Sequence, residues 1–204
     1  MQFLLISPSL DDLIRLLRAW RFWVLGAIVG ALIGAAAYYI APPPYRARAT
    51  VNVDFNLEQA WPQDTDRQQF YYLERETRKL EELAWSDEVV NQVSSEFEVP
   101  VETLRGGQLQ LSQPAEAGWH FYADHRDRNL AASMASAWAT AFVVKAGQEI
   151  ASGNVNEFVD IELTQSAKLP VQRSIPLSGY LLAGSIGFLT LAGFTILFIK
   201  PKSA

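Results

Sequence analysis

The sequence predicts a membrane protein in which two transmembrane helices flank a single α+β extracytoplasmic domain. Residues 22–45 and residues 174–199, stretches of 24 and 26 positions, contain no charged side chain. Each stretch is longer than the roughly 20 apolar residues that cross a ~30 Å hydrocarbon layer as an α-helix. The interval between them has the length of one ordinary domain and contains both strand-like and helix-like patterns, which gives the α+β class.

The N-terminal part predicts a signal anchor that is retained rather than cleaved. Within the cytoplasmic residues 1–21, Leu10–Trp20 has the pattern of an amphipathic helix at the membrane surface, and the first transmembrane helix follows over residues 22–41. The apolar core of this helix is longer than that of a cleaved signal peptide. A glycine recurs at every fourth position of the helix, at Gly26, Gly30 and Gly34. Such a face of small residues favours close packing against another helix.

The second transmembrane helix is expected over residues 175–199, with a cytoplasmic tail over residues 200–204. Its small-residue face is weaker and contains Ala183, Gly184 and Gly187. Prolines mark the junctions between the helices and the extracytoplasmic domain at residues 42–173. They are Pro42, Pro43 and Pro44 on the first side and Pro170 and Pro176 on the second. Proline cannot donate a backbone hydrogen bond, so the helices are expected to stop at these junctions.

The first half of the domain predicts one strand and two helices. From Tyr45 to Phe55, apolar and polar residues alternate without exception, as in a half-buried strand. The helical pattern that follows is divided into a long helix ending near Leu83 and a shorter one capped by Ser86. The apolar stripe expected on the long helix contains Phe70, Leu73, Thr77, Leu80 and Ala84.

The second half predicts two short strands, a long helix and a final strand. The strands cover Gln108–Gln113 and Gly118–Ala123, Asp127 caps a helix running to about Gly147, and Val159–Thr164 form the last strand. The alanine-rich face of this helix is small enough to lie on a sheet or on a neighbouring subunit. Together these elements predict a small mixed sheet packed with helices, whose first and last strands adjoin the two membrane helices.

The charge distribution orients the chain and excludes a nucleic-acid partner. The net charge is −5, and phosphate binding needs a basic footprint. Residues 42–173 hold 20 acidic and 12 basic residues, whereas the two flanks hold 2 acidic and 5 basic ones. Basic flanks place both termini in the cytoplasm. Arg46, Arg48 and Arg173 oppose this bias, but a loop of this length crosses the membrane largely regardless of its charge.

The sequence offers no constellation for catalysis, and no cofactor or metal site is predicted. There is no cysteine, and the two histidines, His120 and His125, are expected to be surface or structural. Among six tryptophans, Trp20 and Trp23 suit a membrane interface and Trp138 suits a core or an interface. Trp61 and Trp119 remain as possible contacts for a glycan or another protein.

Three segments resemble the Wzz chain-length determinant domain of the polysaccharide co-polymerase family. They are the strand at Tyr45–Val53, the alanine-rich helix opening at Asp127–Ala135, and the proline-bearing stretch Pro170–Pro176 before the second helix. The resemblance implies a two-span inner-membrane protein that assembles into rings and controls the length or export of surface polysaccharide. The expected partners are a polymerase, an export channel or a tyrosine kinase. The chain has neither the long coiled-coil arm of larger members nor a kinase domain.

The leading functional hypothesis is therefore a non-enzymatic, homo-oligomeric membrane scaffold acting in the assembly, chain-length control or export of surface polysaccharide such as O-antigen, capsule or exopolysaccharide. Packing through Gly26, Gly30 and Gly34 is expected to hold neighbouring copies side by side. One alternative is an adaptor for a separate cytoplasmic tyrosine kinase. Another is an accessory structural subunit of an unrelated membrane complex.

Overall fold

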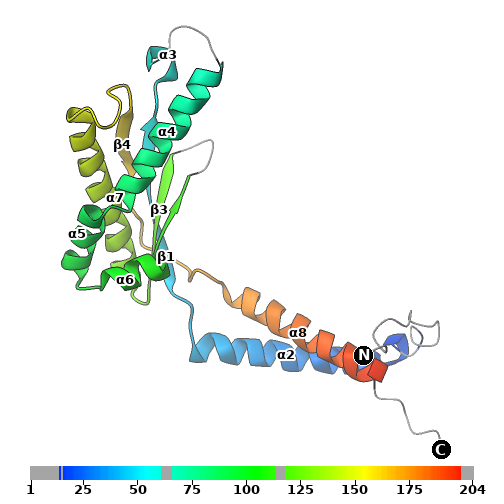
Figure 1. Cartoon of the computed structure of the whole chain (residues 1–204). Coiled ribbons are helices and arrows are strands. Elements are labelled where there is room, and N and C mark those ends of the chain that lie inside the picture. The colour runs from blue at the N-terminus through cyan, green and yellow to red at the C-terminus, as the bar shows by residue number, and fades with distance from the viewer. Residues whose placement is uncertain (1–13, 15, 61–65, 114–117, 199–204) are drawn as a thin grey trace, which may run out of the picture. The chain divides into compact units, whose positions relative to one another are not determined.

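The computed structural model describes residue 14 and residues 16–60, 66–113 and 118–198 (Figure 1). The chain divides into two compact units. Residues 1–43 and 175–204 form a helical unit, and Pro44–Ser174 form an α+β unit. Of the amphipathic helix expected over Leu10–Trp20, residues 10–13 and 15 lie outside the described residues, while residues 14 and 16–18 are helical. The tail after residue 198 also lies outside the described residues.

The helical unit consists of two long apolar helices that pair along their length. They are α2 (Trp20–Ile40) and α8 (Leu177–Phe198). Gly26 lies against Phe188 and Ala192, while Gly34 lies against Tyr180, so the two helices run antiparallel. Their large apolar side chains point outward and are exposed, among them Phe22, Leu32, Leu182 and Phe194. In the helical unit, much of the apolar side-chain surface is therefore exposed rather than buried.

The α+β unit contains one four-stranded sheet. The strands are β1 (Tyr45–Asp54), β2 (Leu109–Ser112), β3 (Trp119–His125) and β4 (Asp160–Gln165), in the order β2-β3-β1-β4. Every pairing is antiparallel, so the expectation of a mixed sheet is wrong. β3 and β4 do run in the same direction, but β1 lies between them, so they do not pair.

The long helix α7 (Arg128–Ala151) covers one face of this sheet and completes the core. Asp127 caps it by accepting from the amides of Asn129 at 2.6 Å and Leu130 at 3.3 Å, as the sequence predicts. The alanines expected on its packing face are all buried: Ala131, Ala132, Ala135, Ala139 and Ala141. Alanines let the helix approach the sheet closely, so of the two partners left open for this face the sheet is the one observed.

Two helices between β1 and β2 pack on α7. They are α4 (Asp66–Ala84) and α5 (Asp87–Phe97), and Ser86 caps the second as expected, accepting from the Val89 amide at 3.4 Å. Two short helices, α3 (Leu57–Ala60) and α6 (Val101–Thr103), and a π-helical turn at Leu104–Gln108 complete the unit.

The buried stripe of α4 differs from the expected one. Leu80 and Ala84 are buried as predicted, but Phe70 is 63% exposed. The inward positions nearer the start of the helix are Tyr72 and Glu76 instead. Because Glu76 is charged, a search for apolar residues at helical spacing cannot identify it as a core position, and the predicted buried face of α4 is therefore rotated from the observed one.

Three helices in the described part of the chain are long and apolar enough to cross a membrane: Trp20–Ile40, Arg128–Ala151 and Leu177–Ile196. Half of the most apolar window of the second is buried within the structure, against 11% for the first and none for the third. The apolar residues of α7 are therefore accounted for by the core of the α+β unit, whereas those of α2 and α8 are not covered by protein.

Candidate functional site

The interface between α2 and α8 depends on backbone contact at glycines. A Cβ atom added to Gly30 would overlap the carbonyl group of Gly184, and one added to Gly184 would overlap the carbonyl of Gly30. A Cβ atom on Gly34 would overlap the carbonyl of Tyr180. The two helices can approach this closely only because these positions lack side chains, which is the usual basis of close helix pairing in lipid.

Some of the packing residues predicted from the sequence lie at the interface between α2 and α8, and others do not. Gly26, Gly30 and Gly34 all face α8 of the same chain. Gly187 meets no neighbouring atom within 4 Å and Ala183 is exposed, while Gly184 makes the contact on α8. The glycine face of α2 is thus occupied by α8 within the chain, and the expectation that it joins neighbouring copies stays a prediction.

Polar and aromatic side chains also contact each other across the interface between α2 and α8. The Ser185 hydroxyl donates to the carbonyl oxygen of Ala27 at 3.1 Å, and the rings of Tyr38 and Tyr180 meet edge to face at 5.5 Å between centroids. A hydrogen bond of this kind has no competing water partner in an apolar environment, so it helps to select one pairing of the helices.

Both ends of the α+β unit are fastened to each other. The amide of Ser174 donates to the carbonyl oxygen of Pro44 at 2.9 Å, and Tyr45 forms an isolated antiparallel bridge with Arg173. The Arg173 guanidinium also lies over the Tyr45 ring, 4.6 Å from its centroid. The strand that enters the unit and the segment that leaves it therefore meet at one point.

The junction prolines flank this point. Pro43 is buried and Pro44 half-buried, and both precede β1 directly. Pro42 and Pro176 are exposed, and Pro170 is half-buried in the segment after β4. None lies inside a helix or strand, consistent with the missing amide hydrogen of proline.

A buried carboxylate, Glu76, ties α4 to the loop after α7. Its side chain is fully buried. It accepts from Arg75 Nε at 2.9 Å, from Lys79 Nζ at 3.1 Å and from the Asn156 amide at 3.2 Å. Burial by itself raises the pKa of Glu76, but the hydrogen bonds from Lys79, Asn156 and Arg75 outweigh it and leave the pKa below its ordinary value. The carboxylate therefore stays ionised and crosslinks two segments.

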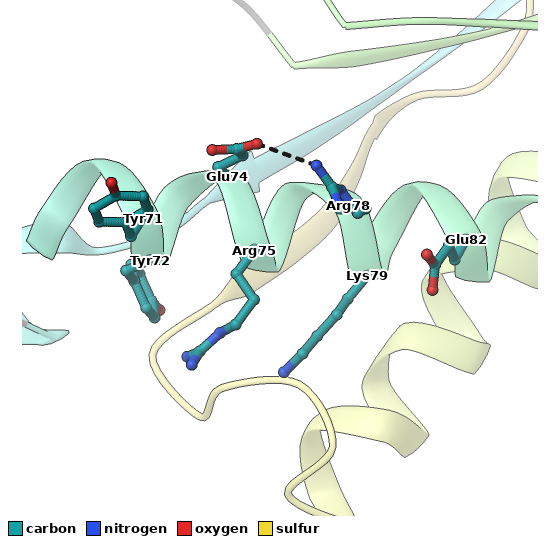
Figure 2. Close-up of a pocket in the computed structure, with 7 residues that line it drawn as sticks. All are labelled: Tyr71, Tyr72, Glu74, Arg75, Arg78, Lys79 and Glu82. Atoms are coloured by element: carbon teal, nitrogen blue, oxygen red, sulfur yellow. Dashed lines mark hydrogen bonds and ion pairs between the residues drawn. The ribbon is translucent and has the colours of Figure 1, made fainter.

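A shallow hollow of about 580 Å³ lies beside this carboxylate on α4 (Figure 2). In Figure 2 Arg75 and Lys79 project together to one side of the helix, and Lys79 Nζ donates to the carbonyl of Asn154 at 2.7 Å. On the other side Arg78 pairs with Glu74 at 3.1 Å. The hollow is lined by Tyr71, Tyr72, Glu74, Arg75, Arg78, Lys79 and Glu82. Its cations already have carboxylate partners, which leaves them poorly placed to recognise a charged ligand.

Both histidines have local partners. His120 lies on the uncovered face of the sheet, where its Nδ1 is 3.2 Å from the Thr50 hydroxyl. Burial, and then the charge of Arg48, lower the pKa of His120. His125 Nδ1 accepts from the Asp127 amide at 3.0 Å and so supports the turn into α7. These contacts are structural ones.

Of the two tryptophans left open by the sequence, Trp119 is a core residue. It is 5% exposed and stacks on Phe142 with centroids 5.7 Å apart. A glycan or a partner cannot reach its ring, because the residue falls on the face of β3 that α7 covers. Trp61 lies outside the described residues. Trp138 is fully buried, and its Nε1 donates to the carbonyl of Ala84 at 2.8 Å.

Sequence reasoning missed Glu76 and the hydrogen bond between Pro44 and Ser174, and it named Gly184 among three small residues without distinguishing it as the contact. The alternating charges on either side of Glu76 are visible in the sequence, but they are equally typical of a solvated helix face. Gly184 could have been found from its register with Gly30 only if the pairing of the helices were known. Among the described residues, no group of three His, Asp or Glu side chains could hold a metal ion.

No model of a known protein family matches the chain, and no curated protein matches it at a significant level. The likeness to the Wzz domain therefore stays a prediction made from three short segments.

Proposed function

We propose that this protein is a non-enzymatic, homo-oligomeric scaffold of the polysaccharide co-polymerase type, anchored in the inner membrane by α2 and α8. In this proposal both termini are cytoplasmic and the α+β unit lies outside the membrane, where it organises a polymerase, an export channel or a growing glycan. The role is geometric and needs no catalytic residue.

One observation carries the proposal: the two helices that flank the α+β unit pair with each other and turn their large apolar side chains outward. Such surface is costly in water and favourable in lipid. α7 is also long enough to cross a membrane, but it is less apolar than the pair, and half of its most apolar window is buried in the α+β unit. The order of helix, strand, domain, strand and helix is the one that the resemblance implies.

The occupied glycine face changes the expected mechanism. Because Gly30 and Gly34 contact α8 of the same chain, they stabilise each copy rather than the contact between copies. In this proposal, contacts between copies are made by other surfaces of the chain. The helix pair anchors both ends of the α+β unit.

Two experiments test this proposal in sequence. Carbonate extraction of membranes, with protease digestion of intact cells and spheroplasts, should leave the chain in the membrane and cleave only the α+β unit from outside. Mass measurement in mild detergent should give an oligomer. A chain that washes out with carbonate, or a strict monomer, would contradict the proposal.

The polysaccharide role is tested in the cells that produce the protein. Deletion of its gene should change the length distribution or the amount of surface polysaccharide, resolved on gels of extracted glycan. Unchanged glycan, with a chain that is still membrane-bound and oligomeric, would favour the accessory-subunit alternative.

A further inference from the structure

The α+β unit has a strongly uneven distribution of charge. Residues 42–173 carry 20 acidic and 12 basic residues. Five of those bases, all arginines, and only two of the acids lie in three short stretches: residues 45–48, 122–128 and 173–174. The arginines are Arg46, Arg48, Arg126, Arg128 and Arg173, and these stretches together are called the arginine end below. A net acidic unit thus has one net basic region.

The sheet brings these stretches together. Tyr45 pairs with His125 and Arg48 pairs with Tyr122, which aligns the start of β1 with the end of β3. Arg126 and Arg128 follow β3 directly, at the turn into α7. Arg173 bridges to Tyr45 from the other side. The arginine end is therefore a single region of the α+β unit, at the point where the chain enters and leaves it.

The two acids of this region are already engaged. Asp124 accepts from Arg46 Nε at 2.8 Å and from Arg46 Nη2 at 2.7 Å. Asp127 accepts from the first amides of α7. Arg48, Arg126 and Arg128 are exposed, and none of the three forms an ion pair with a side chain in the described part of the chain. Positive charge is left over and faces outward.

Only short segments of the chain link this region to the two apolar helices. Tyr45 follows the last residue of α2, Ile40, by five positions, and Arg173 precedes the first residue of α8, Leu177, by four. Even fully extended, five residues span less than about 18 Å, about two to three times the thickness of one interfacial layer beside a ~30 Å hydrocarbon core. With the helices in a bilayer, the arginine end cannot lie far from its headgroups.

We propose that the arginine end binds the phosphate groups of anionic phospholipids in the leaflet from which α2 and α8 emerge. This inference rests on the membrane anchoring proposed above. A guanidinium matches the geometry of a phosphate with two parallel hydrogen bonds and is easier to dehydrate than an ammonium, which suits a region whose exposed bases are arginines. It also gives a role to Arg48, one of the arginines that oppose the positive-inside bias.

Full-length protein in phosphatidylcholine bilayers, probed with spin-labelled phosphatidylglycerol and phosphatidylcholine, tests the inference. Each arginine near an anionic surface contributes up to about fivefold in association. We expect a preference for phosphatidylglycerol of at least about threefold at low salt, falling as the Debye length shortens. The variant Arg48→Gln/Arg126→Gln/Arg128→Gln should lose most of this preference, and the corresponding triple lysine variant should keep most of it.

Arg78→Gln is the control, because Arg78 is exposed on α4 and pairs only with the exposed Glu74 among described residues. The lipid preference of this variant should equal that of the wild type. If the triple glutamine variant keeps the wild-type preference for phosphatidylglycerol, the inference is wrong. An acidic protein would then be the alternative partner of these arginines. Carbonate extraction of the same vesicles separates the two proposals. Loss of the chain from the bilayer contradicts the anchor, whereas a retained chain with no lipid preference contradicts only the arginine end.

Discussion

The two units of this protein use apolar residues in opposite ways. In the α+β unit, alanines and aromatic rings are directed inward, and Trp138, Phe121 and Phe142 are fully buried. In the helical unit, the buried residues of α2 are Gly30 and Gly34, and large apolar side chains such as Phe22, Leu32, Leu182 and Phe194 are exposed. α7 and α2 are both long and apolar enough to cross a membrane, but α7 is the less apolar of the two and a sheet covers it. A long apolar helix is not by itself a membrane helix, because a sheet can cover it equally well.

The largest expected effect concerns the core of the α+β unit. Trp138→Ala removes a fully buried ring that contacts Trp85 and Phe121, at 4.8 Å between centroids in each case. We expect a loss of about 3–5 kcal/mol in the free energy of unfolding, measured by urea denaturation in detergent. Tyr71→Ala is the control, because this side chain is 67% exposed and its removal should cost far less. Equal losses would mean that Trp138 is not a core residue.

The pairing of α2 and α8 should be weakened by adding a side chain at a glycine of their interface, rather than by removing one. Gly30→Val inserts a side chain against the backbone of Gly184 and should weaken the pairing of α2 and α8 by about 2 kcal/mol. A Cβ atom on Gly26 would lie 3.5 Å from that of Ala192, close to disulfide geometry. The yield of a disulfide between Gly26→Cys and Ala192→Cys, in a chain with no other cysteine, therefore reports the pairing.

Gly187→Val provides the control for this experiment, since no atom lies within 4 Å of a Cβ atom there. It should leave the yield of the disulfide unchanged. A loss of yield at Gly187 but not at Gly30 would reverse the assignment of the α8 face.

A smaller effect is expected at the ionic link of the α+β unit. Glu76→Gln weakens the hydrogen bonds to Arg75, Lys79 and Asn156 and should cost about 1–3 kcal/mol. Glu82→Gln, at an exposed position on the same helix, should change stability by much less. Denaturation of both variants beside the wild type measures the difference.

The pH dependence of Glu76 has a definite sign. A carboxyl group whose pKa is lower in the folded chain adds stability above its unfolded pKa, about 4.5, and loses it as the pH falls through the folded value. The stability gap between wild type and Glu76→Gln should therefore narrow below about pH 4.5. A gap that stays constant down to pH 3 would show that the carboxylate is not held ionised by its partners.

The smallest effect is expected on the uncovered face of the sheet. Burial and Arg48 lower the pKa of His120 from 6.5, so the neutral ring favours the folded state, and this contribution is lost as the pH falls from 6.5 through the folded pKa. Arg48→Gln should raise the pKa of His120, followed by NMR titration of the imidazole. His125 serves as the internal control, and an unmoved His120 resonance would disprove the coupling to Arg48.

Much of the fold could be predicted from local patterns. The alternation in Tyr45–Phe55, the cap at Ser86 and the cap at Asp127 each depend on neighbouring residues alone, and the structure has the corresponding strand and helices. The parts that failed depend on distant partners. The direction of β4 is set by β1 more than 100 residues earlier, and the inward position of Glu76 is set by Asn156.

The candidate site was harder to predict for the same reason. Glycine spacing in α2 identifies a face for close packing, but it cannot tell which helix occupies that face or whether Gly184 or Gly187 meets it. Trp119 illustrates the converse problem. Its ring suits sugar stacking as well as a core, and only the position of α7 over the sheet decides between the two.

The central position of β1 also bears on how the chain is completed during synthesis. This strand is made among the first 54 residues, but its two neighbours are β3, ending at His125, and β4, ending at Gln165. The partner of α2 is made later still. The α+β unit cannot close until β4 has been made, and the helical unit cannot close until α8 has been made, so the early segments must wait with unpaired backbone and apolar surface. Ribosome-associated chains of this protein are therefore expected to depend on chaperones or on the insertion machinery until α8 has emerged.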